Sequence, residues 1–214
     1  MAEDAKEATG SMGDDTPLAV LSNKYRPLYH FFRQNFSQVT NPPIDSLREN
    51  KVMSLKTRFG NLGNILDFDN LTEENIYVLN SPILTNNQFE KFVSFFDKNN
   101  KTIDCTFNSD ENIESKLNSI KQEAEIYVRQ GVTQIILSDK NVSKENYPVP
   151  MLLCIGAVHT HLTKMKLRGY VSINVQTGEA LDTHSFATLI GVGATTVNPY
   201  FCLLYTSDAA DETV

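Results

Sequence analysis

The sequence predicts an α/β fold: an open parallel sheet of βαβ units, preceded by an irregular, partly helical N-terminal arm. From about residue 81 onward, short apolar segments alternate with longer segments whose apolar side chains recur at helical spacing. Pro and Gly residues separate these segments, as they do in chains that alternate strands and helices. Three successive βαβ units with right-handed crossovers make either an open wound sheet or part of a (β/α) barrel.

The N-terminal arm, to about residue 95, lacks this regular alternation. Short helices are expected at residues 26–36 and 46–51, where Asp45 can cap the second, and Pro42-Pro43 breaks the chain between them. Residues 61–64, Asn-Leu-Gly-Asn, predict a turn. The first helix carries aromatic side chains at roughly helical spacing, which predicts a core stripe of Phe31, Phe32 and Phe36.

The elements of the regular region follow from local signals. Ser81-Pro82 opens a helical segment with one apolar face, and a long amphipathic helix at residues 112–129 ends just before Gly131. Further helices are expected at residues 151–166 and 182–190, and strands at residues 101–107, 134–137, 170–175 and 195–197. Ligands on parallel sheets bind beyond the carboxyl ends of the strands. The corresponding loops are residues 108–111, 138–150, 176–182 and 198 onward.

Composition narrows the class of partners and the compartment. The 214 residues carry a formal charge of -7, which argues against a nucleic-acid binder, because such proteins need a basic face. No apolar run approaches the roughly 20 residues that span a bilayer, so no membrane partner is expected. The three cysteines are far apart and odd in number, at positions 105, 154 and 202. They predict reduced thiols and a cytoplasmic location.

Histidines near a cysteine suggest a metal site, but their spacing is poor. Residues i and i+2 of a helix point to different faces, so His159 and His161 are not expected to converge on one ion. Cys154 lies about one turn earlier and His184 lies farther on. A packed or solvent-facing histidine pair is therefore the preferred interpretation, and no metal site is expected.

Two other short motifs also have ordinary structural explanations. Gly191-Val-Gly193 follows a helix and lacks the third glycine of a dinucleotide-binding loop, so it predicts a helix stop. Asp14-Asp15 offers two carboxylates, but adjacent side chains diverge in an extended chain and rarely share one cation. The pair predicts an exposed turn or a helix cap.

Asp139 occupies the best position for a general base, because it follows a predicted strand. No basic or nucleophilic partner stands at a matching strand end, and Ser138 has no identifiable histidine partner. The cationic cluster Lys164, Lys166 and Arg168 lies at a helix C-terminus, where positive charge suits the helix dipole. The residues alone therefore predict no catalytic, cofactor-binding or metal site.

Longer motifs resemble the central domain of the large subunit of glutamate synthase. They include Gln-Val-Thr-Asn-Pro-Pro-Ile-Asp at residues 38–45, Ile-Ile-Leu-Ser-Asp at 135–139 and Val-Asn-Pro-Tyr at 197–200. The other matching stretches, in chain order, are residues 10–22, 53–57, 81–84, 148–150, 156–159, 178–180 and 184–187. These motifs are ordered and cover nearly all of residues 1–201.

The resemblance implies a role within a larger oxidoreductase acting on CH-NH2 donors. In that family a glutaminase domain releases ammonia from glutamine, and an FMN synthase domain adds it to 2-oxoglutarate and reduces the product. Electrons pass through FMN and a 3Fe-4S cluster, neither of which the resemblance places in this chain. It implies a central connector whose N-terminal segments help to wall an ammonia passage, lined here by Met12 and Thr40.

By the same resemblance, the partners are the glutaminase and FMN synthase domains of one parent chain. A small electron-donor subunit or ferredoxin is a further expected partner, and NADPH, NADH and ferredoxin remain open as electron donors. We expect this chain alone to be inactive, and Met1 not to be the true start of the parent. Residues 1–95 are expected to form the arm and connector segments, and residues 96–201 the βαβ portion.

The last residues depart from the family. Residues 202–212, Cys-Leu-Leu-Tyr-Thr-Ser-Asp-Ala-Ala-Asp-Glu, match the translation of DNA that resembles a transposase-type sequencing adapter. Residues 202–214 are therefore expected to be an artefactual tail, excluded from the fold.

Two alternatives remain open beside the connector. One is a self-sufficient α/β binding module for a small phosphorylated metabolite at the strand-end loops, which would need a pocket with convergent amide donors. The other is an independent hydrolase that uses Asp139, which would need a nucleophile and a base within hydrogen-bond reach.

Overall fold

The computed structural model describes residues 23, 27–32, 48, 54–60, 66 and 76–202. The chain divides into two compact units, residues 1–54 and residues 55–214. Residues 55–95, which the sequence analysis grouped with the arm, belong to the larger unit.

The described part of the smaller unit contains one turn of 3-10 helix, η2 (Leu28–Phe31), and the helical residue Arg48. Pro27 precedes η2 in extended conformation, and Phe32 leaves the helical region of backbone space. Tyr29 is its buried residue, whereas Phe31 and Phe32 are about half exposed at 51% and 50%. The expected core stripe is therefore wrong for these two phenylalanines, because a single 3-10 turn does not repeat at the 3.6-residue period of an α-helix.

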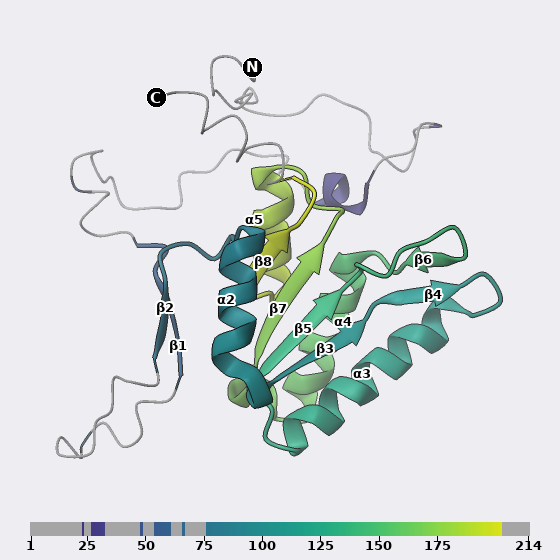
Figure 1. Ribbon diagram of the computed structural model, residues 1–214. Coiled ribbons are helices and arrows are strands. Elements are labelled where there is room, and N and C mark those ends of the chain that lie inside the picture. Colours follow the sequence, from purple (N-terminus) through teal and green to yellow (C-terminus); the bar gives the residue numbers. More distant parts are fainter. Residues whose placement is uncertain are drawn as a thin grey trace. The chain divides into compact units, whose positions relative to one another are not determined.

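The larger unit is built on four parallel strands, which confirms the predicted fold class (Figure 1). The strands are β3 (Asn100–Asp104), β5 (Gln134–Ser138), β7 (Ser172–Thr177) and β8 (Thr196–Pro199), adjacent in that order. Their register pairs Asp104 with Ser138, and Ser138 with Gln176. The outer edge of β8 is partly covered by residues 82–84, since Leu84 N donates to Val197 O at 2.8 Å.

Three crossover helices cover one face of this sheet: α3 (Ile113–Arg129), α4 (Met151–Lys164) and α5 (Thr183–Val192). Asn112 and Asp182 cap α3 and α5 by accepting backbone N–H groups, as polar residues at N-caps do. None of the helices in the described residues is long and apolar enough to cross a membrane.

The opposite face carries α2 (Asn86–Phe96) and a hairpin of β1 (Thr57–Phe59) and β2 (Tyr77–Leu79). Thr85 and Gln88 form a reciprocal capping box that begins α2. The apolar side of α2 packs with both hairpin strands and with Ile136 of β5 in one aromatic-rich cluster. The sequence analysis did not predict the hairpin, because three-residue strands are too short to show an alternating pattern.

The predicted strand at residues 101–107 is in fact two strands. The chain turns at Cys105, where Thr106 donates both its backbone N–H and its hydroxyl to Asp104 Oδ1, at 2.9 and 2.8 Å. The following strand β4 (Thr106–Asn108) pairs with β6 (Asn146–Pro148) in a separate two-stranded antiparallel sheet that projects from the main sheet (Figure 1). This local turn explains why β3 ends at Asp104.

Candidate functional site

The face of the sheet that lies under α2 is unusually polar. Parallel sheets covered on both sides are normally apolar on both faces. Here alternate positions of β5, β7 and β8 carry amides and hydroxyls instead: Gln134, Ser138, Asn174, Gln176, Thr196 and Asn198. Five of these six side chains belong to buried residues, and Gln176 is partly buried. They form two rows of hydrogen bonds that run across the strands.

The inner row crosses the middle of the sheet. Asn174 donates to Gln134 Oε1 at 3.0 Å and accepts from the Thr196 hydroxyl at 2.7 Å. Asn174 also donates to the backbone oxygen of Ile135. No buried side-chain N or O atom of the described residues is left without a hydrogen-bond partner. This row therefore closes on itself and offers nothing to a ligand.

The outer row lies at the carboxyl ends of the strands. Ser138 Oγ donates to Gln176 Oε1 at 2.9 Å, and Gln176 Nε2 donates to Asn198 Oδ1 at 3.3 Å. Asn198 then donates to Asn86 Oδ1 of α2 at 3.0 Å, and Asn86 donates to the backbone oxygen of Tyr200. The row thus connects three strands to the start of α2.

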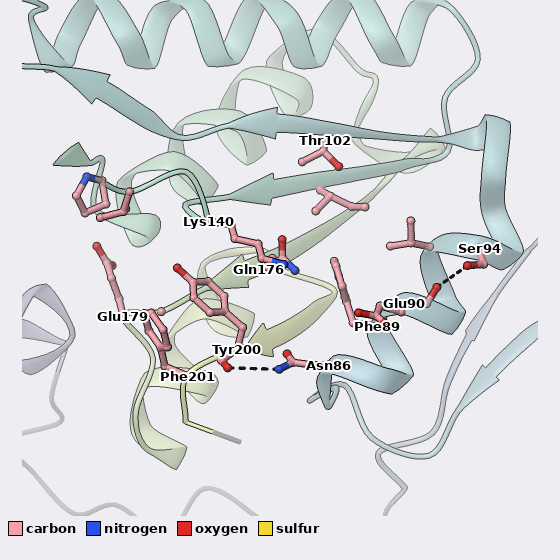
Figure 2. Close-up of a pocket in the computed structure, with 15 residues that line it drawn as sticks. Asn86, Phe89, Glu90, Ser94, Thr102, Lys140, Gln176, Glu179, Tyr200 and Phe201 are labelled. Carbon is pink, nitrogen blue, oxygen red and sulfur yellow. Dashed lines mark hydrogen bonds between the residues drawn. The ribbon is translucent and has the colours of Figure 1, made fainter. Parts of the chain in front are cut away.

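A cavity of about 1020 Å³ opens between α2 and this outer row (Figure 2). Helix α2 lines it with Phe89, Glu90 and Ser94. In Figure 2 the side chains of Lys140 and Gln176 lie between α2 and the wall that contains Tyr200 and Phe201. The loops that follow β5, β7 and β8 complete it, with Val142, Pro148, Gly178, Glu179, Tyr200 and Phe201. Three of the four loops expected to form a ligand site therefore line this cavity. The fourth, residues 108–111, does not line the cavity, because β4 carries it away from the sheet.

Asp139 lies beside this cavity, but both of its carboxylate oxygens already accept hydrogen bonds from the protein. Its carboxylate accepts from Thr177 Oγ1 at 2.5 Å, from Tyr200 Oη at 2.8 Å and from the backbone N–H of Gly178 at 3.2 Å. Asp139 is 2% exposed, and its burial raises its pKa above the usual value despite these hydrogen bonds. Tyr200 is itself partly buried, and this burial, followed by its hydrogen bond to Asp139, raises the pKa of Tyr200. Asp139 therefore joins the ends of three strands and is poorly placed to act as a base.

The backbone N–H groups at the strand ends are also engaged. Gly178 N donates to Asp139, Glu179 N to Thr177 Oγ1 at 3.1 Å, and Lys140 N to Ser138 Oγ at 3.3 Å. The N-terminus of α4 is closed by Glu179, whose Oε2 accepts from Met151 N at 3.1 Å. A phosphate needs free N–H groups at such a site. The arrangement therefore disfavours the phosphorylated-metabolite alternative.

Gly178 allows the far wall of the cavity to close. A Cβ atom at this position would lie 2.6 Å from Cδ2 of Phe201 and 3.0 Å from the hydroxyl of Tyr200. The first distance is shorter than real Cβ contacts and the second is unusually tight, so a side chain here would require the two aromatic rings to shift away from the β7 loop. The rings lie against each other with centroids 4.6 Å apart.

The two histidines of α4, His159 and His161, contact different structural partners. His159 Nδ1 accepts from Arg168 Nε at 3.1 Å, and Arg168 also donates to the backbone oxygens of Val171 and Gly193. Burial lowers the pKa of Arg168. Arg168 thus clamps three segments, which corrects the expectation that it only complements a helix dipole. His161 Nε2 lies 2.6 Å from Glu125 Oε2, on another side of α4.

Gly193 confirms the predicted helix stop. It ends α5 with a φ of 132°, and a Cβ there would lie 2.6 Å from His159 Nδ1. Among the described residues, no three His, Cys, Asp or Glu side chains are grouped as metal ligands would be.

The three thiols do not form one site. Cys105 and Cys154 are both buried, and the neighbouring thiol of Cys154 together with burial raises the pKa of Cys105. Cys202 instead donates to the backbone oxygen of Leu181 at 3.3 Å. Met12, Thr40 and the pair Asp14-Asp15 lie outside the described residues.

The sequence analysis did not identify the amide rows, the hydrogen bond from Tyr200 to Asp139 or the place of Lys140 in the cavity wall. One signal was present: Ser-Ile-Asn-Val-Gln-Thr at residues 172–177 alternates polar and apolar side chains. Such alternation indicates a strand with one polar face. In a parallel sheet it predicts polar groups beneath a covering element.

Comparison with known proteins identifies relatives along almost the whole chain. The family model described as "Glutamate synthase central domain" matches residues 1–213. The large chain of glutamate synthase [NADPH] from Azospirillum brasilense is 57% identical over 94% of this chain and 13% of its own length. Its counterpart from Bacillus subtilis is 41% identical, over 98% of this chain and 14% of its own length. The chloroplastic ferredoxin-dependent glutamate synthase of Spinacia oleracea is also 41% identical, over 95% of this chain and 13% of its own length.

Proposed function

The chain belongs to the glutamate synthase central domain family, and from this premise we propose that it is the connector region of a glutamate synthase large subunit. The observation that carries the proposal is the match over residues 1–213, with 57% identity to one relative. Because the chain spans only 13% to 14% of these relatives, the activity belongs to the parent protein. In that parent, a glutaminase domain releases ammonia from glutamine. An FMN synthase domain then converts it with 2-oxoglutarate to glutamate.

The chemistry of the described residues favours a connector over an independent hydrolase. The carboxylate of Asp139 accepts hydrogen bonds from three groups, and neither Ser138 nor Thr177 contacts a histidine. A hydrolase needs a nucleophile whose base lies within hydrogen-bond reach. We therefore keep the proposal that the chain alone is inactive.

The cofactors proposed for the parent do not fit the described residues. The phosphate of FMN requires free N–H donors, whereas the N–H groups of Lys140, Gly178 and Glu179 are used within the chain. A 3Fe-4S cluster requires grouped thiolates, whereas the buried thiol of Cys105 has a raised pKa. We infer that FMN and the 3Fe-4S cluster are held by other parts of the parent. The reduced thiols suit the proposed cytoplasmic location.

The role of this region is independent of the electron donor. Relatives named for NADPH are 57% and 41% identical to this chain, and relatives named for ferredoxin and for NADH are 41% and 39% identical. Similarity to relatives with all three electron donors suits a part of the protein that does not contact the donor. A small electron-donor subunit or ferredoxin would then interact with another region of the parent.

Met12 and Thr40 are proposed to line an internal ammonia passage, by the family resemblance. Such a passage must be narrow and shielded from bulk water. Methionine suits a movable plug, because its side chain is unbranched and flexible. Thr40 supplies a hydroxyl, and the following Asn-Pro-Pro stiffens the chain.

The test uses a full-length parent enzyme that contains this region. Met12→Ala and Thr40→Val are introduced, and glutamine hydrolysis and glutamate formation are measured together. We expect the ratio of the two rates to depart from coupled stoichiometry while the thermal midpoint is retained. Ile126→Ala is the control, because this α3 side chain is 53% exposed. If both rates fell in step with stability and the ratio held, the two residues would only pack.

A further inference from the structure

The cavity beside α2 contains two charged side chains that the fold does not use. Lys140 follows Asp139 at the end of β5, and Glu90 lies on α2. Within the described part of the chain, neither side chain makes a hydrogen bond or an ion pair, and both residues are exposed. Both line the same cavity (Figure 2). A ligand in this cavity therefore meets one ammonium and one carboxylate group that are free to pair.

Gln176 adds an oriented donor near Lys140. Its Oε1 accepts from Ser138, and one N–H of its Nε2 donates to Asn198. A carboxamide carries two N–H donors, so the second remains at the cavity wall. Gln176 pairs across strands with Ser138, and Lys140 is only two residues beyond Ser138. An ammonium group and an amide N–H on adjacent strand ends match the two oxygens of a carboxylate.

The rest of the lining limits the chemistry of the ligand. Phe89, Val93 and Ile136 give the cavity an apolar wall, which suits a chain of methylene groups. Glu90 and Glu179 oppose a dianion by charge repulsion, and the strand-end N–H groups are occupied. A phosphate is thus disfavoured, whereas a ligand with both a carboxylate and an ammonium group is favoured.

We propose that this cavity binds a small α-amino acid of the glutamate class. A carboxylate faces Lys140 and Gln176, the ammonium group faces Glu90, and the methylene groups lie on Phe89 and Ile136. The cavity exceeds the volume of one amino acid, so water fills the remainder and the affinity is modest. The lining residues favour an α-amino acid with a side-chain or main-chain carboxylate, and the choice of the glutamate class among these rests on the proposed function. The site would be an accessory one, apart from the reactions assigned to the parent's other domains.

The experiment measures binding to the 214-residue chain by ligand-observed NMR titration. Three probes are compared: L-glutamate, glutarate, which lacks the ammonium group, and inorganic phosphate. We expect L-glutamate to bind with a Kd on the order of 1 mM, glutarate to bind several-fold more weakly, and phosphate to show no saturation. The absence of saturable L-glutamate binding up to about 20 mM would overturn the proposal, as would equal binding of phosphate.

Paired variants locate the site. Lys140→Gln should weaken both L-glutamate and glutarate by about tenfold, whereas the control Lys144→Gln, an exposed residue of the same loop, should change neither. Glu90→Gln should abolish the preference for L-glutamate over glutarate, and Glu145→Gln should leave it intact. Circular dichroism confirms that each variant is folded. If Lys140→Gln and Lys144→Gln bound alike, the site would be wrong, while the connector proposal, tested by coupling in the parent, would be unaffected.

Discussion

The two faces of the four-stranded sheet differ in almost every chemical respect. Toward α3, α4 and α5 the strands present aliphatic side chains, all fully buried: Ile135, Leu137, Ile173, Val175 and Val197. Toward α2 the same strands present Ile136 and, around it, amides and hydroxyls that bond to one another. Neighbouring residues of a single strand therefore contribute to folding by different physical means.

The aliphatic face mainly supplies the free energy of folding, whereas the polar face mainly fixes the register of the strands. Burial of aliphatic groups is favourable but non-directional, so the helix-covered face tolerates many arrangements of similar volume. The amide rows contribute little net free energy, because each hydrogen bond replaces one made to water. They do fix the register, since a one-residue slip would turn the amides toward the helices and the aliphatic groups toward α2.

The largest expected effect comes from the aliphatic face. Ile173→Ala should lower the free energy of unfolding by about 2–5 kcal/mol, because Ile173 is fully buried in β7 and its removal leaves a cavity. Urea unfolding followed by circular dichroism measures it. Ile126→Ala is the matched control, and it should change stability by less than about 0.5 kcal/mol. A loss of similar size in both variants would show that the chain lacks a specific core.

The polar face should behave differently under single and combined substitution. Asn174→Leu should cost about 1–3 kcal/mol, because it leaves Gln134 and Thr196 buried without their partner. Replacing the whole inner row, with Gln134→Leu, Asn174→Leu and Thr196→Val together, should recover much of that loss. If the triple variant instead lost the sum of the three single-variant costs, the three side chains would act independently and the row would not be a closed network.

The sequence predicted the aliphatic face better than the polar one, for a physical reason. Apolar runs such as residues 134–137 and the capped helix at residues 112–129 carry their signal locally. The strands and crossover helices were therefore placed to within a few residues. The amide rows depend on strand order and register, which bring Ser138, Gln176 and Asn198 together from three separate strands.

The candidate site was predicted only in outline. The rule that ligands bind at strand ends identified three of the four loops, but it could not show that α2 would form the opposite wall. It also could not show that the Asp139 carboxylate would accept hydrogen bonds on both oxygens, because the donors come from β7 and from Tyr200, 61 positions away. Arg168 was misjudged for the same reason, since its acceptors include Gly193, 25 positions away.

An effect of similar size is expected where the polar face meets the cavity. Gly178→Ala should cost about 1–3 kcal/mol, because the new methyl group would overlap the ring of Phe201. Gly191→Ala is the contrasting control: its Cβ meets open space in α5, so it should stabilise the chain by about 0.5–1 kcal/mol. Unfolding midpoints of the two variants should therefore shift in opposite directions. Shifts of the same sign would show that the aromatic rings move aside freely.

The smallest effect is a difference in pH dependence between two aspartates at neighbouring strand ends. Asp139 is buried, and burial raises its pKa above 3.8 despite the hydrogen bonds from Thr177, Tyr200 and Gly178. At Asp104 partial burial also acts to raise the pKa. Hydrogen bonds from Asn141 and Thr106 outweigh it there, so the pKa falls below 3.8.

The two shifts have opposite consequences for stability. A raised pKa in the folded state means that Asp139 favours folding when protonated, and this contribution is lost as the pH rises from 3.8 through the raised pKa. A lowered pKa means that Asp104 favours folding when ionised, and this contribution is lost as the pH falls from 3.8 through the lowered pKa. The stability advantage of the wild type over Asp139→Asn should therefore shrink with rising pH. Its advantage over Asp104→Asn should grow. Free energies of unfolding measured across acidic pH test both, and two slopes of the same sign would contradict the idea that burial dominates at one strand end and hydrogen bonding at the other.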